Sequence, residues 1–133
     1  MSNSGFFKTR LAGGAIAPFR IVAHGAADHT VLQAAAATNA LCGLTQQLGA
    51  SAAGKQVDVF VHPGEHGQPE VEYGGIVTRG DPLTSDAAGK AIKAEAVAGS
   101  TVRIIGFADV SGVAGDIVAF QFAPGVIYAP AAA

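Results

Sequence analysis

The stretch AGKQVDVFVHPG, residues 53–64, carries the clearest secondary-structure signal in the chain. Val57, Val59 and Val61 occupy every second position, and successive side chains of a β-strand point to opposite faces of its sheet. A Gly precedes this run and a Pro-Gly pair follows it, as is common where a strand meets a turn. The stretch therefore predicts a half-buried β-strand that ends in a tight turn.

A similar stretch, AGDIVAFQFAPG at 114–125, indicates an internal repeat. Three further pairs match in the same chain order: IVAHG with IVTRG, VLQAAAA with AIKAEAV, and CGL with IGF. The repeat covers about 21–64 and 76–125, and its second copy has a longer turn, GDPLTSDAAGK against GAADHT. Two copies are too few for a solenoid. We therefore expect two similar halves that close into one β-barrel or sandwich over residues 20–130.

The composition of the 133 residues also favours an all-β fold. Half of the residues are apolar, 14% are charged and 18 are glycine, which indicates a folded chain of many short elements joined by tight turns. Two Ala-rich segments, residues 32–51 and 93–100, allow one or two short helices. The predicted fold class is all-β, a compact β-barrel with these helices as its exceptions.

Charge and hydropathy argue against two classes of partner. The formal net charge is −2 and no basic run occurs, so the surface that nucleic-acid binding requires is missing. No apolar run approaches the roughly 18 residues of a transmembrane helix, so we expect a soluble protein with no membrane partner. Cys42 is the only cysteine, and we interpret it as a small buried hydrophobe.

Residues 1–19 precede the repeat and follow neither the helical nor the strand period. Their large apolar side chains would be unusual in a solvated tail, so we expect an extended N-terminal arm that makes a contact. The arm either docks on a neighbouring molecule or folds back over its own barrel. Deletion of residues 2–15 is expected to leave a folded domain. The candidate partner-binding residues are Phe6, Phe7, Arg10, Leu11 and Ile16.

The string HPGEH, residues 62–66, has the H-x-x-E-H order of the inverted zinc peptidases. In those enzymes a helix brings both histidines onto one metal ion, whereas here Pro and Gly separate them and a predicted strand precedes them. We interpret the string as a turn. A metal site would instead require His62 and His66 to meet the other predicted histidine turn, at His24 and His29.

Two other short strings are interpreted as turns as well. GASAAGKQ, residues 49–56, lacks the Ser or Thr that follows Lys in a phosphate-binding loop. The tripeptide RGD, residues 79–81, stands before a proline at the end of a predicted strand. No nucleophile motif is present. We predict no catalytic set, no metal site and no cofactor.

The longest ordered pattern in the chain carries a family resemblance. VEYGGIVTRGDPLTSDAAGKAIKA, residues 71–94, and VRIIGFADVSGVAGDIVAFQFAPG, residues 102–125, resemble the head decoration, or capsid cement, proteins of tailed bacteriophages. The resemblance covers nearly the whole chain after the arm. It implies that the following motif residues form the turn framework of the fold: Gly75, Thr78, Gly80, Asp81, Pro82, Asp86 and Gly89.

The resemblance also implies a function. It predicts a β-barrel or β-tulip-like domain without enzymatic activity that lies on the outer surface of the virion head. Such proteins clamp neighbouring major capsid proteins and associate with themselves as dimers or trimers, which stabilises the expanded shell against the packaged DNA. Two alternatives stay open: a small metal-dependent hydrolase that uses His62 and His66, and a β-barrel that binds a small ligand in an apolar interior.

Overall fold

The computed structural model describes residues 6–64 and 67–130, and this part of the chain contains ten β-strands and no helix. The strands are β1 (Phe6–Ala12), β2 (Ile21–His24), β3 (Thr30–Gln33), β4 (Leu41–Leu44), β5 (Gln56–His62), β6 (Glu70–Glu72), β7 (Pro82–Ser85), β8 (Ala91–Lys93), β9 (Thr101–Ala108) and β10 (Ile117–Tyr128). The all-β prediction is confirmed. No helix long and apolar enough to cross a membrane occurs in the described residues.

The prediction of short helices in the Ala-rich segments is wrong. Residues 32–51 hold the end of β3, all of β4 and the loops around them, and residues 93–100 hold the end of β8 and a loop. Ala34 and Leu44 have no exposed surface because both pack in the core. The helix preference of alanine amounts to only about half a kcal/mol per residue, so burial and strand pairing outweigh it.

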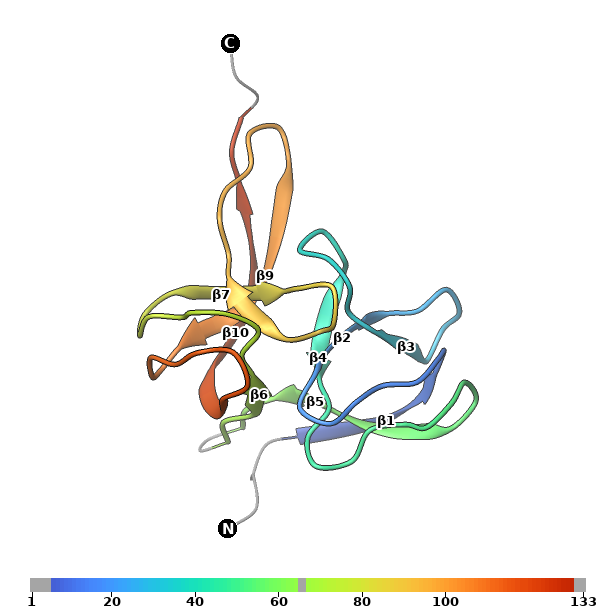
Figure 1. The fold of residues 1–133 in the computed structure, drawn as a ribbon. Helices are drawn as coiled ribbons and strands as arrows, with labels where there is room; N and C mark the ends of the chain where they lie inside the picture. Colours follow the sequence, from blue (N-terminus) through green and yellow to red (C-terminus); the bar gives the residue numbers. More distant parts are fainter. Residues whose placement is uncertain (1–5, 65–66, 131–133) are drawn as a thin grey trace.

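The ten strands form two groups that lie side by side (Figure 1). The first five close into a barrel in the order β1-β3-β2-β4-β5, and the last five form a sheet in the order β6-β10-β9-β7-β8. Each pairing in the barrel has a counterpart in the sheet. The parallel pairing of β1 with β3 corresponds to one parallel bridge between Tyr73 and Ala91. The prediction of two similar halves is confirmed.

One segment of the sequence repeat is misaligned. The structure makes IVAHG equivalent to PLTSD, residues 82–86, and not to IVTRG, because Ile21 pairs with Leu44 as Pro82 pairs with Phe107. The longer turn expected in the second copy is also wrong. Residues 26–29 form the β2–β3 turn inside the Gly25–Thr30 hydrogen bond, whereas only residues 87–89 lie inside its counterpart between Asp86 and Lys90.

The segment expected to be an arm contains β1, which is a strand of the first barrel. β1 pairs in antiparallel fashion with β5 and in parallel with β3, so both of its edges are used. Its counterpart in the second half is β6, because Ala12 donates a hydrogen bond to Lys55 as Tyr73 donates one to Asp116. Of the two placements left open for these residues, the structure shows the one on the chain's own barrel.

Two principal clusters of buried side chains form the core. One fills the first barrel and includes Val22, Val57 and Val59. The other fills the second half and extends across to the outer face of the first, where Phe60 is buried with Phe120. The alternation predicted in β5 is therefore present, but both faces of the strand are covered. The start of β9 and the end of β10 extend beyond the rest of the molecule (Figure 1), and a small cluster around Val102 lies there.

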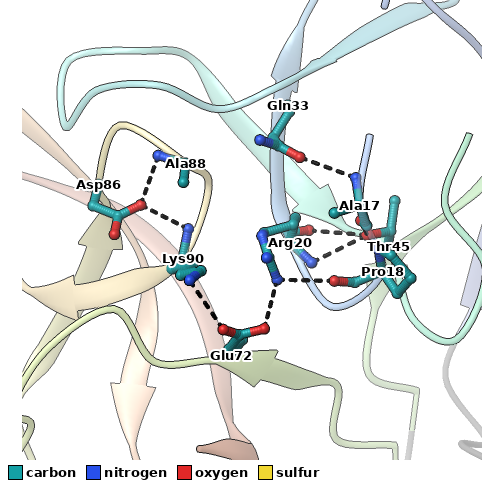
Figure 2. A network of polar contacts seen from close by, with 9 residues as sticks. All are labelled: Ala17, Pro18, Arg20, Gln33, Thr45, Glu72, Asp86, Ala88 and Lys90. Atoms are coloured by element: carbon teal, nitrogen blue, oxygen red, sulfur yellow. Dashed lines mark hydrogen bonds and ion pairs between the residues drawn. The ribbon is translucent and has the colours of Figure 1, made fainter. Parts of the chain in front are cut away.

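Polar contacts join the two halves (Figure 2). Arg20, just before β2, donates a hydrogen bond of 2.9 Å to Glu72 of β6, and Lys90 lies 3.1 Å from the other oxygen of the same carboxylate. The side-chain amide of Gln46 bonds both the N–H and the carbonyl of Glu70, as a neighbouring strand would. The halves are therefore held by directed bonds as well as by a shared core.

The turn between β7 and β8 packs directly on the first half. Asp86 accepts hydrogen bonds from the backbone N–H groups of Ala88 and Lys90, which closes the turn (Figure 2). Gly89 has a φ of 74°, and its carbonyl accepts a hydrogen bond of 2.8 Å from Ile21. A side chain at this position would meet Gln33 at 2.8 Å. Glycine is thus required both by conformation and by close approach.

Candidate partner-binding surface

The exposed part of β1 provides an apolar surface on the first barrel. Phe6 is 61% exposed, Phe7 40% and Leu11 43%. The ring of Phe7 packs edge-on against buried Phe60 at 5.5 Å, so the barrel core holds it in place. Phe6 lies 5.7 Å from the ring of His62. We refer to Phe6, Phe7 and Leu11 as the β1 face.

The other two predicted partner-binding residues lie elsewhere. Ile16 is 2% exposed and belongs to the core of the first barrel, where it bridges to Ala50. Its side chain therefore has almost no surface to offer a partner. Arg10 borders a cavity at one end of the barrel together with His24 and Cys42. The sequence shows that this region is rich in apolar residues. Which of them are buried and which are exposed is decided by the strand pairing and could not be predicted from the sequence.

Exposed apolar residues that the sequence reading missed occur in the second half. Ile76 is 81% exposed and Val113 is 55% exposed, and they flank the isolated bridge between Val77 and Gly112. Val126 and Tyr128 are both exposed on the projecting part of β10. For Val126 and Tyr128 the signal in the sequence is the alternation that marks the strands, but it gives no indication of which face stays uncovered. Ile76 and Val113 lie outside the strands, where no such alternation applies.

The histidines do not form a metal centre within residues 6–64 and 67–130, where no three His, Cys, Asp or Glu side chains are grouped suitably. His62 ends strand β5, and its Nδ1 accepts a hydrogen bond from the N–H of Gly64. Gly64 has a φ of 65°, as expected for the predicted turn. Glu65 and His66 lie outside the described residues.

The contacts around Cys42 and around the RGD tripeptide give both of them a role in the structure. Burial is the main cause that raises the pKa of the Cys42 thiol to about 11, although nearby Arg10 opposes the rise. The thiol is therefore uncharged and unreactive at neutral pH. The carboxylate of Asp81 accepts a hydrogen bond from the N–H of Thr78 in its own turn. Asp81 thus closes the RGD turn itself.

Comparisons with known proteins give a likeness of fold. No protein-family model matches the chain. No curated protein matches it in sequence either. Among solved structures, the N base of the head fiber gp8.5 of bacteriophage phi29 superposes with a TM-score of 0.63 over 89% of this chain and 93% of that chain, at 19% sequence identity. This chain therefore has the same fold as the base of that head fiber.

Proposed function

We propose that this protein is a structural component of the head of a tailed bacteriophage and binds the outer surface of the shell. The observation that carries the proposal is the shared fold with the base of a phage head fiber, which extends over nearly the full length of both chains. The resemblance of residues 71–94 and 102–125 to head decoration proteins points to the same location.

The partner in this proposal is the major capsid protein. Clamping requires that one molecule, or one dimer or trimer, contacts two or more capsid subunits at once. Simultaneous contacts raise the effective concentration of each contact, so individually weak contacts hold the shell together. The proposed role is mechanical and uses no cofactor.

The β1 face is the proposed capsid contact. Phe6 and Phe7 lie where β1 pairs with β5, and Leu11 lies where it pairs with both β5 and β3, so the backbone of all three is held before binding. A preformed surface loses little conformational entropy when it binds. Phe6 and Leu11 are the residues to change, because Phe7 also packs against the core.

A binding assay with purified heads tests the proposal. Expanded heads from a phage that encodes this chain, stripped of the protein, are sedimented with added wild-type protein or with the double variant Phe6→Ser, Leu11→Ser. We expect the wild type to sediment with the heads and the variant to bind at least about tenfold more weakly, because two apolar contacts are lost.

Leu48→Ser is the matched control, since Leu48 is an exposed leucine of the first half outside the β1 face. It should bind as the wild type does. Absence of wild-type binding to heads would overturn the proposed function. Equal loss in the control and the double variant would overturn only the assignment of the β1 face.

A further inference from the structure

A cavity of about 300 Å³ lies at one end of the first barrel, where Phe122 and Pro124 of β10 complete its lining. Its walls are mainly apolar, and they include Val31, Leu41 and Val59. The two groups able to donate strong hydrogen bonds in its lining are the guanidinium of Arg10 and the imidazole of His24. Apolar walls with a few polar groups are typical of sites for small organic molecules, and this volume lies at the lower end of their range.

The second half of the chain shows that the fold itself does not require this cavity. Arg10 pairs with Val57 as Val71 pairs with Val118, so Arg10 and Val71 hold equivalent positions. In the same register, larger side chains replace smaller ones at three inward positions of the second half: Tyr73 for Ala12, Ile105 for Cys42, and Phe120 for Val59. All three are fully buried there. The space at this end of the first barrel is therefore left by its smaller side chains and is not required by the fold.

Arg10 supplies a charge without a described counter-charge. Among residues 6–64 and 67–130 no carboxylate forms an ion pair with it, and its guanidinium makes one long hydrogen bond of 3.4 Å to the carbonyl of Thr9. Cys42 beside it is held in the neutral thiol form by burial. A half-buried guanidinium with most donors unused favours an anion, and it bonds carboxylates in particular with two parallel hydrogen bonds.

We propose that the cavity of the first barrel binds a small organic anion with an apolar body, of the class of medium-chain carboxylates. The carboxylate meets Arg10 and His24 at the mouth, and the hydrocarbon chain lies against the valines inside. This inference does not depend on the proposed function, because none of the residues that line the cavity belongs to the β1 face.

Octanoate is the probe that tests the inference. Titrated into the full chain, it should produce saturable chemical-shift changes at the amides of Val31, Val59 and Val61. Arg10→Met should weaken octanoate binding by about tenfold or more, the effect of losing charged hydrogen bonds. The affinity for octanol, which has no charge, should change much less. Arg103→Met, an arginine near the start of β9, serves as the control and should bind octanoate as the wild type does.

A second variant fills the cavity with the residues that the second half uses. Val59→Phe with Cys42→Ile should abolish octanoate binding and leave the circular dichroism spectrum unchanged. The absence of saturable shifts in the wild type would overturn the inference. Should the filled variant fail to fold, the Arg10→Met titration decides, and an unchanged octanoate affinity there would overturn the role of the guanidinium.

Discussion

At the scale of single residues, Glu72 connects the two halves of the molecule. Its carboxylate lies between Arg20 of the first half and Lys90 of the second (Figure 2). Burial alone would raise the pKa of Glu72, but the hydrogen bonds and charges of Lys90 and Arg20 together outweigh it and lower the pKa below its ordinary value. The ionised form is therefore the one that the folded state stabilises.

Replacement of Glu72 by Gln should lower the free energy of unfolding by about 1–2 kcal/mol at pH 7, because two charged hydrogen bonds are weakened. A carboxylate with a lowered folded pKa stabilises the protein above its unfolded pKa of about 4.3, and this contribution is lost as the pH falls through the folded pKa. The difference between wild type and variant should therefore shrink below about pH 4.

Urea denaturation across this pH range measures the difference. Glu95→Gln, at an exposed position, is the control and should match the wild type at every pH. A Glu72→Gln variant whose deficit stays constant down to pH 3 would contradict the assigned role of the carboxylate.

Substitution of Gly54 and of Gly89 distinguishes the cost of backbone strain from the cost of crowding. Both have positive φ, but a Cβ at Gly54 meets nothing within 4 Å, whereas one at Gly89 meets Gln33 and two carbonyl groups of the first half. Gly54→Ala should cost about 1 kcal/mol of stability from conformation alone. Gly89→Ala should cost about 2–4 kcal/mol, because crowding adds to the strain. Equal costs in thermal or urea unfolding would show that the packing of this turn on the first half contributes little.

At the scale of elements, the sequence identified β5 reliably, identified the first part of β10 and misplaced β1. β10 does not end at its Pro-Gly pair as β5 does, but continues to Tyr128 past an irregularity between Phe122 and Gly125. Alternation with Gly and Pro at both ends marks β5 clearly. β1 has no such pattern, because Phe7 and Leu11 are exposed on one face while Arg10 lies at the cavity on the other. β1 and β6 are equivalent in their backbone pairing. Their side chains follow no common pattern, so the sequence does not reveal the equivalence.

The misaligned repeat segment has a similar origin. IVAHG and IVTRG share letters, but one is a strand and the other follows the β6 strand as a loop. The glycine pairs Gly13-Gly14 and Gly74-Gly75 are the positions that are structurally equivalent in the two halves. The first pair follows β1, and the second follows its counterpart β6. The candidate surface could be anticipated in part, since exposed aromatic residues need a contact. Which of them are exposed depends on tertiary pairing.

The position of β1 changes the expected effect of truncation. Deletion of residues 2–15 removes β1 and leaves the edges of β3 and β5 unpaired, so we now expect the first barrel to unfold or to aggregate. Circular dichroism and gel filtration measure the outcome. A chain that lacks only residues 2–5 keeps all of β1 and should fold. A monomeric, native-like protein without residues 2–15 would contradict the closed barrel.

At the scale of the whole molecule, the two halves should unfold together. Their largest core cluster joins Phe60 and Leu44 of the first half to Phe120 and Tyr73 of the second, so separation of the halves would expose buried side chains of both. We expect one cooperative thermal transition with equal calorimetric and van't Hoff enthalpies. Differential scanning calorimetry measures both enthalpies. Two resolved transitions would show that the halves are independent folding units.

The central claim is the place of this protein on a phage head, and electron microscopy of purified virions tests it most directly. We predict density with the shape of the barrel and the adjoining sheet on the outer surface of the head, in contact with major capsid proteins and with the β1 face turned toward the shell. The copy number would give the association state. Intact virions of a phage that encodes the chain, with no such density on their heads, would contradict the account.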